Sequence, residues 1–154
     1  MAYIVVRVRG NINVRKSIRD TLQMLRLNKV NHCVVIPETI EYKGMLKKAK
    51  DYITWGEVEP KLLSEVLSAR GRLQGDEPLT DKYIKSNSKF KSLTNFTEEI
   101  IKGKAKLSDL KAIKPVLRLH PPRKGYEGIK RSFALGGALG YRGDKINDLV
   151  RRMI

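Results

Sequence analysis

Residues 3–9 read Tyr-Ile-Val-Val-Arg-Val-Arg, and this alternating stretch decides the fold. Ile4, Val6 and Val8 fall on one face of an extended chain, because successive side chains of a strand point to opposite faces. Arg7 and Arg9 fall on the other face. The period of two therefore predicts a half-buried β-strand whose second face carries charge.

The segments that follow extend this strand into a β-α-β-α-β core over residues 1–56. Apolar residues recur every three or four positions over residues 14–25, which predicts an amphipathic helix. β-branched residues are dense in residues 30–36 and a proline ends the run, which is typical of a second strand. A second helix over residues 40–49 and a third strand over residues 52–55 complete the core.

Residues 57–114 change character, because their apolar positions take helical spacing and acidic residues gather where helices begin. One helix is expected between Pro60 and Gly71, which match the proline and glycine preferences of helix starts and stops. A short helix is expected after Thr80, and another that ends at Gly103. We predict a helical, near-neutral extension of the core.

Residues 115–154 form the most unusual part of the chain. A short strand is expected over residues 116–119. Six of the twelve glycines then fall between His120 and Gly143, so this arm is expected to be mobile alone and ordered by a partner. Asp144 is a candidate N-cap for a closing amphipathic helix. We expect the arm and the closing helix to pack with the core as one compact unit.

Positive charge is concentrated at both ends of the sequence. The formal net charge is +16, from 32 basic and 16 acidic side chains. Residues 1–56 carry 11 basic and 4 acidic side chains, residues 57–110 carry 10 and 9, and residues 111–154 carry 11 and 3. Such a surplus repels itself in a free monomer, whereas a polyanion stabilises it and releases counterions on binding. The charge pattern therefore predicts a nucleic-acid-binding protein.

The residues that carry catalysis or bind metals in other proteins are sparse in this chain. Cys33 has no second cysteine for a disulfide or a zinc site, and it points away from the adjacent His32 along a strand. His32 is therefore interpreted as a structural histidine, whereas His120 is either structural or a contact to a base or phosphate. We expect no catalysis, metal, cofactor or small-molecule substrate. Without a signal peptide or an apolar run of about 20 residues, we expect a cytoplasmic protein without membrane contact.

Two further patterns leave alternatives open. Aromatic residues interleave with the basic residues of the arm, as in proteins that stack on unpaired bases. The alternative, which we favour for Phe133, is that Phe133 and Leu135 anchor the arm to the folded body. The lysines near Gly44 form either a solvated helix face or part of an interface. A glycine at this position is typical of a close approach by another backbone.

Five stretches, in order, resemble the large-subunit ribosomal protein family called L-thirty in bacteria and L-seven in eukaryotes. They are RVRGN (7–11), IRDTLQMLRL (18–27), VNHC (30–33), YKGM (42–45) and YITWG (52–56). Bacterial members stop near the last of these. The stretch LRLHPPR (117–123) and the glycine-rich run after it are similar to the longer archaeal members.

This resemblance implies an α+β fold with a ferredoxin-like arrangement. A three-stranded sheet has the first strand at its centre and both helices on one face. The resemblance also implies a ribosome-bound structural protein that binds large-subunit ribosomal RNA near the 5S RNA and stabilises its fold. Neighbouring ribosomal proteins are further partners, and no catalytic activity is implied.

From motif position and charge, the resemblance implies RNA contacts at the first strand-to-helix turn, on the second helix and in the C-terminal arm. They are Arg9, Asn11, Arg15, Lys16, Arg19, Lys43, Lys47, Lys48, His120, Arg123, Lys124, Lys130, Arg131 and Arg142. Two alternatives remain open at this point. A general nucleic-acid-compacting protein explains the charge equally well, and an RNA-processing enzyme has weak support from the two histidines.

Overall fold

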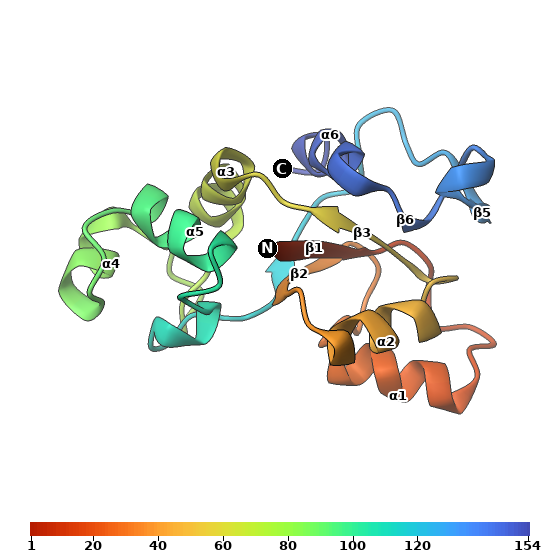
Figure 1. Ribbon diagram of the computed structural model, residues 1–154, viewed down its shortest axis with the longest axis horizontal. Coiled ribbons are helices and arrows are strands. Elements are labelled where there is room, and N and C mark those ends of the chain that lie inside the picture. Colours follow the sequence, from red (N-terminus) through yellow and green to blue (C-terminus); the bar gives the residue numbers. More distant parts are fainter.

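Strand β1 (Ala2–Arg7) lies inside a six-stranded sheet in the computed structural model, which describes residues 1–154 (Figure 1). It pairs antiparallel with β2 (His32–Pro37) on one side and with β3 (Ile53–Glu57) on the other. The predicted central place of the first strand between two others is therefore confirmed. The sheet is larger than the three strands predicted.

Three further strands extend the sheet to the order β4-β2-β1-β3-β6-β5. Strand β4 (Leu117–Arg118) pairs antiparallel with β2. Strand β6 (Gly137–Tyr141) pairs parallel with β3, and β5 (Gly128–Ser132) forms the other edge. Strands β5 and β6 come from the arm. Strand β3, the partner that joins β6 to the rest of the sheet, lies far away in the sequence, so no local pattern predicts this pairing.

Helices cover both faces of the sheet, and β1 is consequently buried on both faces. Helices α1 (Lys16–Met24) and α2 (Ile40–Lys48) pack over Tyr3 and Val5, as predicted for two helices on one face. Helices α3 (Pro60–Arg70) and α6 (Ile146–Arg151) cover the opposite face. The prediction of a half-buried strand with a charged second face is wrong, because the chain supplies a second helical layer.

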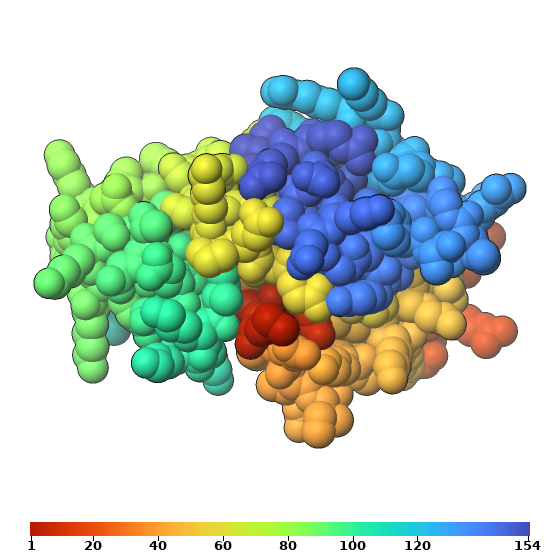
Figure 2. Space-filling view, turned by 45° about the horizontal axis from the view of Figure 1, so that its top comes forward, coloured from red at the N-terminus to blue at the C-terminus, as the bar shows by residue number.

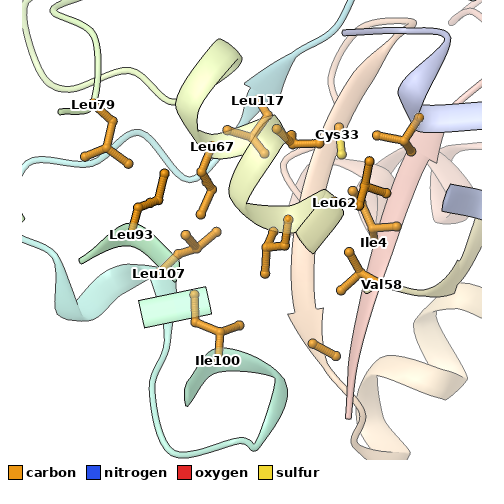
Figure 3. Packing of buried hydrophobic residues seen from close by; sticks show 14 of the residues in the cluster. Ile4, Cys33, Val58, Leu62, Leu67, Leu79, Leu93, Ile100, Leu107 and Leu117 are labelled. Atoms are coloured by element: carbon orange, nitrogen blue, oxygen red, sulfur yellow. The ribbon is translucent and has the colours of Figure 1, made fainter. Parts of the chain in front are cut away.

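The middle segment, residues 57–114, is helical, as expected, and shares its core with the sheet. It contains α3, α4 (Asp81–Asn87) and α5 (Leu93–Ile101). Thr80 caps α4 and Ser92 caps α5, since each side chain accepts a backbone N–H of the first turn. Figure 3 shows leucines of α3 between buried residues of the sheet, such as Ile4, and buried residues of the later part of the middle segment, such as Leu93 and Leu107.

The arm packs more tightly than its composition suggests. Ala138 and Leu139 of β6 are buried against Val8, so this part of the glycine-rich arm is packed without a partner, contrary to the expected mobility. Leu135 is 76% exposed and is not an anchor. The apolar face of α6 is buried as predicted. Asp144 is not its N-cap, because it lies in a 3₁₀ turn and the helix begins after Lys145.

Candidate nucleic-acid interface

The end of β1 is organised by Arg7, whose side chain is 2% exposed. Its Nε donates to the carbonyl oxygen of Arg9 at 2.8 Å, and its Nη2 donates to the carbonyl oxygen of Gly10 at 3.1 Å and to the side-chain oxygen of Asn11. Its Nη1 donates to the carbonyl oxygen of Leu27, across in the loop before β2. Burial lowers the pKa of Arg7. The alternating sequence predicted Arg7 on a charged, exposed face, and no local pattern indicates that it holds two loops.

Arg9 joins the same loop to the turn between α2 and β3. Its guanidinium lies over the Tyr52 ring at 5.1 Å, and its Nη1 donates to the carbonyl oxygen of Asp51 at 3.3 Å. The backbone N–H groups of Val8 and Arg9 both donate to the carbonyl oxygen of Tyr52, at 2.9 and 3.2 Å. The loop after β1 therefore lies beside the C-terminal end of α2.

Strand pairing gathers the cations of these segments at one end of the sheet. Arg7 lies opposite Ile53, so the end of β1, the start of α1 and the end of α2 share that end. Seven predicted contacts lie there, and each is exposed or half-exposed. We define the β1-end surface as these seven residues, Arg9, Asn11, Arg15, Lys16, Arg19, Lys47 and Lys48.

The start of α1 is electrostatically uncompensated. The N-cap position is Arg15, which makes no side-chain capping bond, and the first turn holds no acidic residue. A helix N-terminus carries partial positive charge and free N–H groups, and nearby anions stabilise it. Here Lys16 and Arg19 add positive charge instead. The arrangement favours an external anion at this point.

The remaining predicted contacts on α2 and in the arm lie on the surface, apart from one. Lys43 is exposed and paired with Glu38 at 2.7 Å, and this pairing lowers the pKa of the Glu38 carboxyl. Five predicted contacts of the arm are exposed, namely His120, Arg123, Lys124, Lys130 and Arg131. The last two lie on the edge strand β5, far from the middle helices (Figure 2).

Arg142 is the exception, because it is 6% exposed and serves the fold. Its Nε donates to the Thr54 hydroxyl oxygen at 2.9 Å, and its Nη2 donates to the carbonyl oxygen of Ala138 at 2.9 Å. The guanidinium lies over the Phe133 ring at 4.8 Å, and burial lowers the pKa of Arg142. The expectation of a surface contact at Arg142 is corrected, since charge alone does not tell a bracing arginine from an exposed one. Phe133 is half-buried beneath the side chains of Arg142 and Lys145, which belong to the same C-terminal segment, so its favoured role as an anchor to the folded body stays a prediction.

His32 and Cys33 lie within the sheet, whereas His120 lies in the exposed loop after β4. His32 is half-buried on β2, and burial, then Arg118 and Lys29, lower its pKa, so the ring is neutral at pH 7. Cys33 is fully buried, which raises the pKa of its thiol. The structure groups no three histidine, cysteine or acidic side chains that could hold a metal ion. None of its helices has the length and apolarity to cross a bilayer.

Comparison with known proteins gives one consistent result. Residues 3–53 match the family described as "Ribosomal protein L30p/L7e". A protein from Methanoregula boonei, named "Large ribosomal subunit protein uL30", is 54% identical over 152 residues, which cover 98% of this chain and 99% of the relative. Proteins of the same name from Methanobrevibacter smithii and Methanocorpusculum labreanum are 52% and 50% identical, each over at least 98% of both chains.

Proposed function

This chain belongs to the uL30 family of large-ribosomal-subunit proteins, and we propose that it binds large-subunit ribosomal RNA through its β1-end surface. Membership makes it a structural protein of the ribosome in the cytoplasm, of the longer archaeal type that the sequence indicated. It is not an enzyme, so the RNA-processing alternative is wrong.

The observation that carries the proposal is the uncompensated positive pole at the start of α1. Free backbone N–H groups, Arg15, Lys16 and Arg19 gather there without an acidic neighbour in the first turn. Arg9 and the end of α2 add further cations beside it. In the free protein these charges repel one another, whereas backbone phosphates offset the charge and accept from the N–H groups.

The loops that carry these cations are already held in place before any partner binds. Arg7 ties the loop after β1 to the loop before β2, and Asn11 donates to the carbonyl oxygen of Asn28 at 3.1 Å. A loop backbone that is already ordered loses little conformational entropy on binding, which favours a partner of matching shape. Folded RNA offers such a shape, since its helices are recognised largely through backbone geometry.

We also propose a second contact through the five exposed residues of the arm, and a position near the 5S RNA. The support is charge and exposure, because β5 is exposed along its whole length and carries Lys130 and Arg131. Cross-linking from β5 within intact large subunits tests this part, with recovery of 5S RNA as the expected result. Recovery of large-subunit RNA alone would contradict the 5S position.

A pair of double variants tests the β1-end surface. Lys47→Ala/Lys48→Ala removes two exposed lysines at the end of α2, and Lys82→Ala/Lys85→Ala removes two exposed lysines from α4. Both lose the same charge. We expect the first variant to weaken binding to large-subunit RNA by roughly 10- to 30-fold. We also expect it to reduce the salt slope, which is the steepness with which the logarithm of the binding constant falls with the logarithm of the salt concentration, by about 1.5. The second variant leaves both quantities near their original values.

Equal effects of the two variants would contradict the β1-end surface. Competition with random duplex DNA separates the compaction alternative. If the original protein binds folded ribosomal RNA and random duplex with comparable affinity at physiological salt, general compaction is the better description.

A further inference from the structure

A cationic cleft lies outside the predicted contacts, where the middle segment meets the β4 edge of the sheet. Its volume is about 240 Å³. The lining residues come from the end of α3, the turn after it, the segment that leads into β4, and β4 itself. They are Arg70, Arg72, Asp76, Lys114, Val116 and Arg118. Four of the six carry positive charge and one carries negative charge.

The backbone brings these cations together and keeps them there. The N–H of Lys114 donates to the carbonyl oxygen of Arg72 at 2.8 Å, and Leu73 bridges to Ile113. Arg118 is placed by the pairing of β4 with β2, opposite His32. Arg72 and Lys114 thus sit on two paired backbone segments, and moving them apart requires breaking backbone hydrogen bonds.

The protein compensates only part of this charge. Asp76 pairs with Lys114, and this hydrogen bond lowers the pKa of the Asp76 carboxyl. Arg118 makes no ion pair. The Nε of Arg70 is buried and has no hydrogen-bond acceptor, although buried donors are nearly always paired. The cleft is therefore short of acceptors and of negative charge.

We propose that this cleft binds a phosphate group of the large-subunit RNA backbone. The inference rests on the proposed function and adds a contact from the segment whose average charge is close to neutral. Guanidinium groups suit phosphate because their planar donors meet two oxygens at once. Arg118 also lies at the same end of the sheet as Arg7, since it pairs opposite His32 and the adjacent Cys33 pairs with Val6. An RNA strand that follows the β4 edge reaches both places.

The test uses full-length protein and the double variant Arg72→Gln/Arg118→Gln, with Lys82→Gln/Lys85→Gln as the matched control. Binding to large-subunit RNA is measured over a range of salt concentrations. We expect the cleft variant to reduce the salt slope by about 0.7 to 0.9, the value for one phosphate contact, and to weaken binding several-fold. The control leaves the slope unchanged. An unchanged slope in the cleft variant overturns the proposal.

A second measurement does not depend on the variants folding correctly. In the unaltered protein, acetylation of Lys114 is compared with and without bound RNA, and exposed Lys85 on α4 is the internal reference. Protection of Lys114 with unchanged Lys85 supports the proposal. Equal reactivity of Lys114 in both states overturns it.

Two further comparisons separate the possible outcomes. If Lys47→Ala/Lys48→Ala lowers the slope and the cleft variant does not, the β1-end surface stands and the cleft proposal fails. If neither variant lowers it, both fail. In the second comparison, inorganic phosphate alone is titrated into the protein while the Nε–H signals of Arg70 and Arg118 are followed by NMR. A saturable shift together with an unchanged RNA slope identifies a site for free anions and overturns the proposal.

Discussion

Buried arginines hold the surfaces on which the exposed cations lie. Arg7 joins the loop after β1 to the loop before β2, and Arg142 braces β3 against β6. Arginine suits both positions because its five donors are fixed in one plane and reach several acceptors at once. Lysine offers three donors on a single atom, so the two residues are not interchangeable here.

The first prediction concerns Arg7→Lys. The ammonium group cannot reach all four acceptors, so buried carbonyl oxygens lose their partners. We expect the free energy of unfolding to fall by about 2 to 4 kcal/mol, measured by urea denaturation. Arg131→Lys on the exposed edge strand is the control, with an expected change within about 0.5 kcal/mol. Equal stability of the two variants would sink the bracing role of Arg7.

The second prediction concerns the pH response of Tyr141, whose hydroxyl donates to a Glu57 carboxylate oxygen at 2.6 Å. This hydrogen bond raises the pKa of Tyr141 to about 12. Because the folded pKa lies above the ordinary value of about 10, the stabilisation is fully present below pH 10 and is lost as the pH rises through about 12. In Glu57→Gln the midpoint of the Tyr141 ring signal moves toward 10 in an NMR titration. An unchanged midpoint would contradict the assigned cause.

At the scale of elements, glycines have different roles in helices and strands. Gly44 lies inside α2, where an added Cβ meets no atom within 4 Å. The expected close approach by another backbone is therefore not made within this chain. Gly137 of β6 is different, because a Cβ there lies 2.1 Å from the carbonyl oxygen of Arg131. Glycine at this position permits close packing of the arm. We had instead interpreted the glycine content of the arm as a sign of mobility.

The third prediction compares two glycine-to-alanine changes. Gly44→Ala raises the free energy of unfolding by about 0.5 to 1 kcal/mol, because alanine is the better helix former. Gly56→Ala lowers it by about 1 to 3 kcal/mol, because the new Cβ lies 2.0 Å from the carbonyl oxygen of Gly143. Thermal unfolding of both variants measures the difference. A loss of stability in Gly44→Ala would show that α2 has a neighbour at this position.

At the scale of the whole molecule, charge is separated along the sheet. The cations of the β1-end surface lie where β1 ends, whereas α3 leaves the sheet beyond Glu57, which pairs near the start of β1. Figure 1 shows α4 and α5 extending away from α1 and α2. One end therefore suits a polyanion, and we propose that α4 and α5 face solvent or a neighbouring ribosomal protein.

The fourth prediction concerns hydrogen exchange of the whole chain. We expect the amides of β1 to exchange slowest of the strands, because β1 is buried and paired on both sides. Strand β5 exchanges fastest, since it is an exposed edge. Bound ribosomal RNA adds protection to β5 and to residues 120–127, and leaves α4 unchanged. Equal exchange of the arm with and without RNA would remove it from the interface.

Much of the fold and part of the interface were predictable from the sequence. The helices α1, α3 and α5 and the strands β1 to β3 follow from apolar periods that span only a few residues. The exposed cations near Arg9 and Lys47 follow from charge and motif position. The roles of Arg7 and Arg142 could not be predicted in this way, because the burial of a side chain depends on residues far away in the chain, such as Thr54 for Arg142.

The sequence by itself determined the elements and the uneven distribution of charge, since both depend on neighbouring residues. Only the tertiary structure decided that the arm adds β5 and β6 to the sheet, which arginines are buried, and that four cations line one cleft. These features arise where distant segments meet. Thr54 pairs with Gly140, and Lys114 bonds to Arg72, so chain folding rather than local pattern places them together.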